Sequence, residues 1–139
     1  MKDIMIKFTF TLLLLLPIGF VSAGSPSPMG ASVYIISPAD GDTVSEKVTV
    51  KFGLMGMGVA PAGIDKKNTG HHHLLIDGKE LPMSGKAMGK EVKHFGGGQT
   101  ETSVTLSKGM HTMQLMLGNH QHMPHNPPVA SKKITIHVK

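Results

Sequence analysis

Histidine and methionine are the residue types of this chain that could do chemistry. The 139-residue sequence holds nine His, eleven Met and no Cys. Imidazole nitrogen is a good ligand for copper, zinc and nickel, and thioether sulfur selects Cu(I). Two short stretches, His111-Thr112-Met113 and His122-Met123, bring both ligand types together. The composition therefore indicates a metal site, and the lack of Cys excludes a zinc finger or a thiol-redox centre.

Strand geometry decides which histidines can cooperate. Side chains two residues apart on a strand share a face, so His71 and His73 can converge while His72 faces the other side. His94 precedes the run Gly96–Gly98, whose missing side chains allow close backbone approach. The remaining candidates lie on a strand and on the loop that leaves it. We expect the metal ligands to come from His71, His73, His94, His111, His122 and His125.

Copper is the metal we expect, with zinc as the second choice, and the expected role is a carrier or buffering domain. A structural interpretation stays open, because His111 at a strand end could be a core histidine bonded to a backbone carbonyl. Methionines could also fill a core that is poor in aromatic residues. The alternative function is then a non-catalytic immunoglobulin-like envelope interaction domain whose histidines are structural.

Catalytic motifs are missing from the sequence. The run Gly96–Gly98 is not followed by Lys and Ser or Thr, so it is not a phosphate loop. Neither H-E-x-x-H nor the G-x-S-x-G elbow occurs. We therefore expect no enzyme, and we assign no catalytic residue.

The N-terminus has the three parts of a secretory signal peptide. Lys2 and Lys7 are positive, an apolar stretch follows to Phe20, and Val21-Ser22-Ala23 supplies small residues for cleavage. The apolar part is shorter than the roughly 20 residues that span a bilayer. We expect residues 1–23 to be a cleaved signal, the mature chain to be periplasmic or secreted, and no membrane span to remain.

Charge excludes one class of partner. The net charge is +5, every basic residue is Lys, and aromatic residues make up only 4% of the chain. Nucleic-acid binders usually cluster Arg with Lys and interleave aromatic residues. We therefore expect no nucleic acid as a partner; the expected partners are a metal ion and another envelope protein.

The elements that must position the histidines are short strands separated by turn signals. Residues 24–31 are expected to form a flexible leader, and residues 32–139 a single domain. Alternation is clear from Val48 to Phe52, and helical periodicity is absent throughout this domain. The pattern predicts an all-β fold, an immunoglobulin-like antiparallel β-sandwich of about seven short strands. The clearest expected strands cover residues 32–36, 44–52, 71–77, 100–106, 110–117 and 132–138.

Three sequence blocks carry a resemblance. GHHHLLID at 70–77, HFGGGQTE at 94–101 and HMPHNPPV at 122–129 are similar to a family of small exported bacterial domains of unknown function. Some members of that family carry a rod-shape-determining or ATPase label. The resemblance covers nearly all of the mature chain, and it implies one exported β-rich domain without an established activity. It marks as motif positions His71, His72, His73, His94, His111, His122 and His125.

A looser similarity links the chain to small periplasmic copper carriers, which also place His and Met on the loops of a β-sandwich. This sequence departs from their ligand spacing. His72 and Met83 fit the first interval of that spacing, but no residue fits the next.

Overall fold

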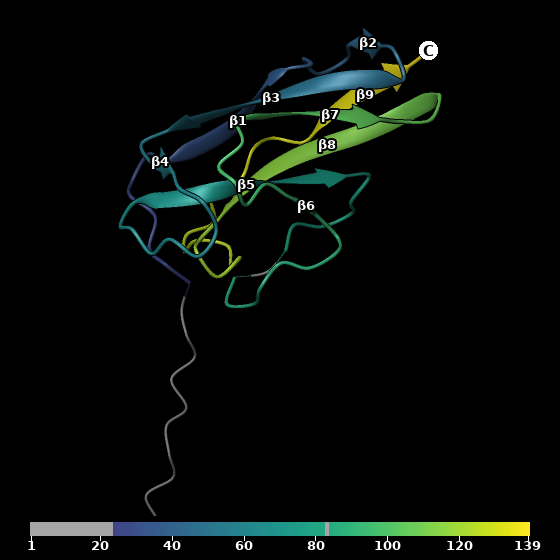
Figure 1. Ribbon diagram of the computed structural model, residues 1–139. Coiled ribbons are helices and arrows are strands. Elements are labelled where there is room, and N and C mark those ends of the chain that lie inside the picture. Colours follow the sequence, from purple (N-terminus) through teal and green to yellow (C-terminus); the bar gives the residue numbers. More distant parts are fainter. Residues whose placement is uncertain (1–23, 83) are drawn as a thin grey trace, which may run out of the picture.

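The computed structural model describes residues 24–82 and 84–139 (Figure 1). The expected signal peptide, residues 1–23, lies outside this part of the chain. Within the described ranges every regular element is a strand, and no helix is long and apolar enough to cross a membrane. The strands are β1 (Ser32–Ser37), β2 (Thr43–Val44), β3 (Lys47–Met55), β4 (Gly58–Val59), β5 (Thr69–Ile76), β6 (Lys93–His94), β7 (Glu101–Thr105), β8 (Gly109–Gly118) and β9 (Ile134–Val138).

The strands form two stacked sheets, which confirms the predicted all-β sandwich (Figure 1). One sheet has the order β1-β3-β7, and the other has the order β2-β9-β8-β5-β4, with β6 also paired to β5. The strand number exceeds the expected seven because β2, β4 and β6 are only two residues long. The larger sheet is mixed, since β2 pairs with β9 and β4 with β5 in parallel.

The core between the sheets follows from alternating side chains. In β3, Val48, Val50 and Phe52 are buried while the lysines and threonine between them are exposed, as the period-two pattern predicts. Facing them from the larger sheet are residues of the same hydrophobic cluster, among them Leu74, Met113, Leu115, Leu117 and Ile136.

Strand β5 is buried on both faces. Its residues from Gly70 to Leu75 are all buried. Leu74 packs in the core between the sheets, whereas Leu75 belongs to a second, smaller cluster with Met88, Val92 and Met116. Figure 1 shows the loop between β5 and β6 and the loop after β8 on the side of the sheet away from β3. These loops therefore cover the outer face of β5, and they create a second protected layer outside the sandwich core.

Part of the segment expected as a flexible leader is hydrogen-bonded to the domain. The backbone N–H of Ser27 donates to the carbonyl of Asn126 (3.2 Å), and the N–H of Asn126 donates to the carbonyl of Ser25 (3.0 Å). Gly24 is itself buried. The start of the described chain thus lies along the loop that follows β8.

The core predicts a clear difference between two isoleucines. Ile136→Ala removes a side chain with no exposed surface from the core of the sandwich and should lower the free energy of unfolding by about 2–5 kcal/mol. Ile36→Ala is the matched control, because Ile36 is 57% exposed on β1, and it should cost less than about 1 kcal/mol. Chemical denaturation measures both values, and equal losses would contradict this placement of the core.

Candidate metal centre

The register of β5 gathers three histidines. His71 and His73 point to the outer face of the strand, with ring centroids 4.7 Å apart. β6 pairs with β5 in antiparallel register, and His94 is the direct cross-strand partner of His73. The ring of His94 consequently lies 5.2 Å from that of His73 and 4.9 Å from that of His71.

The loop after β8 supplies a fourth histidine. β8 ends at Gly118, opposite His71, and the chain then turns around the buried Asn119. The side-chain oxygen of Asn119 accepts hydrogen bonds from the backbone N–H groups of Gln121 (2.9 Å) and Met123 (3.0 Å). Between these two residues His122 adopts a left-handed backbone with φ of 62°, a conformation that non-glycine residues seldom take. The turn places His122 Nδ1 3.1 Å from His71 Nε2.

Together these residues form a cluster that could hold a metal ion. His71, His73, His94 and His122 each offer one ring nitrogen, and these four nitrogens all lie within 4.8 Å of one another. Four nitrogens bound tetrahedrally at about 2.0–2.1 Å from an ion lie roughly 3.3 Å apart. A modest contraction of the cluster is therefore enough to complete a tetrahedral site.

Glycines make the room that the rings occupy. A Cβ atom at Gly118 would lie 2.5 Å from His73 Cε1 and 3.0 Å from His73 Nδ1. A Cβ atom at Gly96 would lie 2.6 Å from His94 Nε2. The distances of 2.5 and 2.6 Å are too short for a Cβ atom unless the ring moves, so the rings of His73 and His94 depend on these two glycines.

Burial keeps His71, His73 and His94 uncharged. Desolvation, aided by the neighbouring His94 and His122, lowers the pKa of His71 to about 4. Desolvation and the adjacent His71 lower the pKa of His73 to about 3, and burial also lowers the pKa of His94. A charged imidazolium is disfavoured in a buried site and beside other positive charge. At neutral pH these rings therefore keep the free lone pairs that a metal ion needs.

The buried rings also lack hydrogen-bond partners. Neither ring nitrogen of His73 has one, and His71 Nδ1 has none, although both side chains are buried. A buried polar atom without a partner costs about 1–3 kcal/mol. A bound ion would satisfy the nitrogens that face it, so the donor set fits a metal.

His125, another candidate ligand, lies beside this cluster but outside the four. It is buried, and its Nδ1–H donates to the carbonyl of Ser25 (3.2 Å). Its Nε2 has no partner and faces Gly70, where a Cβ atom would lie 2.9 Å away. Burial lowers the pKa of His125 as well. His125 therefore anchors the loop after β8 to the start of the described chain.

The structure separates His111 from the other candidate ligands. It lies towards the far end of β8, roughly 24 Å from Gly118 at about 3.4 Å per residue. His111 Nδ1 lies 2.7 Å from Asp77 Oδ2, and Nε2 lies 2.9 Å from the carbonyl oxygen of Ser107. The hydrogen bond to Asp77 is the main reason that the pKa of His111 is raised. Both nitrogens donate, so this ring is an imidazolium that ties β8 to two turns.

Ser107, His111 and Asp77 are connected in the same order as a Ser-His-Asp triad, but the hydrogen bonds of His111 do not suit a catalytic base. Ser107 Oγ lies 3.3 Å from His111 Nε2. That nitrogen already donates to the carbonyl of Ser107, and it has no lone pair to accept a hydroxyl proton. The arrangement is the carbonyl-bonded histidine that the structural interpretation of His111 expects.

Two further histidines have their own contacts. His72 faces the core, where its ring lies 5.0 Å from that of Phe52 and its Nδ1 lies 3.2 Å from the carbonyl of Gln99. His120 lies 3.4 Å from the carboxylate of Asp65. Sequence reasoning missed the supporting residues, above all Asn119 and Gly118. Only the short spacing between Gly118, Asn119 and His122 hinted at a tight turn there.

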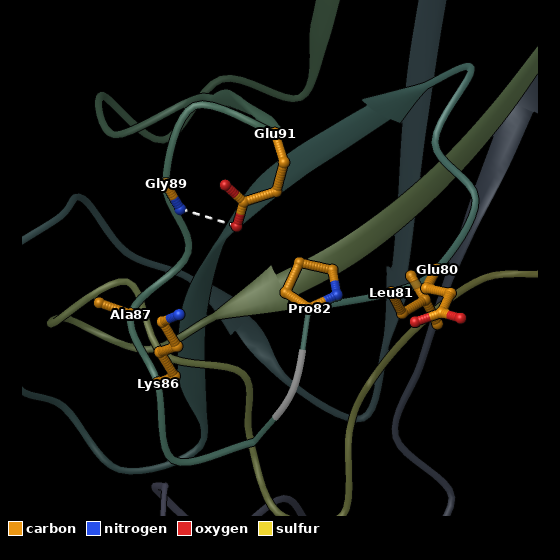
Figure 2. Close-up of a pocket in the computed structure, with 7 residues that line it drawn as sticks. All are labelled: Glu80, Leu81, Pro82, Lys86, Ala87, Gly89 and Glu91. Atoms are coloured by element: carbon orange, nitrogen blue, oxygen red, sulfur yellow. Dashed lines mark hydrogen bonds between the residues drawn. The ribbon is translucent and has the colours of Figure 1, made fainter.

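A separate hollow lies on the loop between β5 and β6 (Figure 2). It has a volume of about 430 Å³. The loop closes on itself where the backbone N–H of Gly89 donates to Glu91 Oε1 (2.9 Å). No histidine is among its lining residues, which are Glu80, Leu81, Pro82, Lys86, Ala87, Gly89 and Glu91. This hollow and the candidate metal centre are thus different places.

Comparison with known proteins identifies a family. The model of a family described as a domain of unknown function, DUF4399, matches residues 50–139. The chain belongs to this family. All four clustered histidines fall inside the matched residues, whereas Ser25, which supports the loop after β8, falls before them. Searches of curated proteins and of solved structures gave no match.

The His111–Asp77 pair predicts a defined pH dependence. Burial alone raises the pKa of Asp77, but hydrogen bonds from His111 and the backbone of Thr112 outweigh burial and lower it. The stabilisation is full between the ordinary values of 3.8 and 6.5. It is lost as pH rises through the raised pKa of His111 or falls through the lowered pKa of Asp77.

Asp77→Asn tests this pair, because Asn tolerates the left-handed backbone at this position and can still accept the bond from Thr112. Asp77 is half-exposed, so solvent weakens the pair, and we expect a loss of about 1–2 kcal/mol near pH 5.5. The loss should shrink near pH 9. Asp65→Asn, which removes the exposed partner of His120, is the control and should change stability by less than about 0.5 kcal/mol. A loss that does not vary with pH would refute the charged pair.

The space at Gly118 gives another prediction. Gly118→Ala should force the ring of His73 to move and lower the free energy of unfolding by about 1–3 kcal/mol. Gly58→Ala on β4 is the control, because the nearest atom to its Cβ would be Thr69 Cγ2 at 3.5 Å. Denaturation curves compare the two variants, and equal stability would show that the packing at Gly118 is loose.

Proposed function

We propose that this domain binds a transition-metal ion, copper in the first place, and carries or buffers it in the cell envelope. The observation that supports the proposal is the cluster of four imidazole nitrogens within 4.8 Å of one another. Two of these histidines are buried with unpaired nitrogens, and the rings are neutral at the pH of most cells. His111, which lies outside the cluster, instead has partners for both nitrogens.

The donor set favours copper, with zinc as the second choice. All four donors are imidazole nitrogens, and the cluster contains no carboxylate. Carboxylate ligands suit magnesium, calcium and manganese, whereas imidazole suits copper, zinc and nickel. Among divalent ions at a given nitrogen site, copper binds most tightly.

Transport or buffering suits this site better than catalysis. Catalytic zinc sites keep one position open for water or substrate, while four protein ligands fill a tetrahedral ion. His71 and His73 are buried, but His94 is exposed and His122 half-buried. The ion would thus be held from below by β5 and reached from the side of His94, where a donor or acceptor of the metal can approach.

The envelope location rests on the signal-like N-terminus. A chain without cysteine forms no disulfide, so its covalent structure is the same in a reducing and in an oxidising compartment. A His-based site suits an oxidising compartment, because imidazole does not form disulfides. Fractionation of cells that produce the full chain, with detection of residues 24–139 in the periplasm or medium, tests this part.

Metal binding is tested by competition against a chelator of known affinity, with Cu(II), Cu(I) and Zn(II) offered in turn to the purified protein. We expect one ion per chain and sub-micromolar binding of copper. His73→Ala should weaken binding at least about 100-fold, because it removes a ligand and not only a supporting contact. His111→Ala is the matched control, because His111 was also expected as a ligand from the sequence but lies outside the cluster. The copper affinity of this variant should equal that of the unmodified protein.

Two outcomes would overturn the proposal. Micromolar or weaker copper binding that is the same in the His73 and His111 variants would show adventitious contact with a His-rich chain. Binding lost in the His111 variant alone would move the site to the other end of β8. The first result would leave the non-catalytic interaction domain as the better account, and the second would refute the four-histidine cluster as the binding site.

A further inference from the structure

We infer that Met88 supplies a thioether ligand to the His71/His73/His94/His122 cluster and makes the site a holder of Cu(I) as well as of Cu(II). This inference rests on the proposed function and extends it to the oxidation state of the ion. It concerns a residue outside the four histidines of the cluster.

The backbone ties Met88 to the cluster. Met88 lies in the loop between β5 and β6, and its N–H donates to the carbonyl of His122 at 2.8 Å. The loop that covers the outer face of β5 is therefore fastened to the very residue that completes the four nitrogens. A side chain at this position starts next to the site.

The side chain of Met88 then turns towards the ring of His73. A Cβ atom at Gly118 would lie 2.6 Å from Met88 Cε and 2.5 Å from His73 Cε1, so both groups fill the same small space above that glycine. In methionine Cε is bonded directly to the sulfur. The sulfur is thus one bond away from a methyl group that shares the space above Gly118 with the ring whose two nitrogens have no partner.

The surroundings suit a soft, neutral ligand. Met88 is 9% exposed and packs with Leu75, Val92 and Met116. Thioether sulfur binds Cu(I) in preference to harder divalent ions. A buried apolar site also favours the ion of lower charge, because each added charge increases the cost of leaving water. Sulfur at the edge of an all-imidazole cluster therefore stabilises the reduced ion selectively.

Met88→Leu tests the inference, because leucine keeps the volume of the side chain and removes the sulfur. Met113→Leu is the matched control, since Met113 is a fully buried methionine of β8 that packs in the core between the sheets. The probes are Ag(I), a soft ion that does not change oxidation state, and Cu(I) under a reductant, each titrated against a competing chelator. We expect Met88→Leu to weaken both about 10- to 100-fold while binding of Cu(II) and Zn(II) changes less than about threefold.

X-ray absorption at the copper edge gives a readout that packing alone cannot move. The Cu(I) protein should show one sulfur scatterer, and the Met88→Leu variant should show nitrogen scatterers only. Unchanged Ag(I) and Cu(I) affinity in Met88→Leu, or a sulfur signal that survives it, would refute the role of Met88. The proposed function would still stand in that case if His73→Ala abolishes Cu(II) binding. If the unmodified protein binds none of these metals, both the role of Met88 and the proposed function are refuted.

Discussion

The burial of neutral imidazole rings on the outer face of β5 is the constraint on which the rest of the site depends. Burying a charged ring costs free energy, and burying an uncharged ring whose nitrogens lack hydrogen-bond partners also costs free energy. The loop between β5 and β6 and the loop after β8 keep water away from this face, and the mutual repulsion of the rings keeps protons away. A metal ion is a ligand that could accept one lone pair from each of the four clustered rings together.

The loop after β8, more than any strand, sets the position of the fourth histidine, His122. Asn119 holds its turn through two backbone N–H groups, and its side-chain amide donates to Ser25 Oγ (3.0 Å). The left-handed backbone of His122 is sustained by these bonds. The beginning of the described chain therefore takes part in shaping a site that is built mainly from residues far along the sequence.

Some of this arrangement was readable from local pattern. Alternation in β3 predicted its buried face, and the spacing of His71 and His73 predicted a shared face. The pairing of His94 with His73 was not readable, because a two-residue strand carries almost no periodicity and register depends on the whole sheet. A position on β8 does not tell which end of a ten-residue strand meets the cluster, and so His111 was grouped with residues from which it is distant. Residues 1–23 stay a prediction, because they lie outside the described part of the chain.

Because β5 is buried on both faces, its even-numbered and odd-numbered residues have different roles. Even-numbered positions such as His72 and Leu74 face the sandwich core, while odd-numbered positions such as His71 and His73 face the cluster. A change of ligand set can therefore proceed along one row of side chains while the other row continues to hold the sheets together. In a scan of substitutions from His71 to Leu74, loss of folding and loss of binding should therefore alternate from one residue to the next.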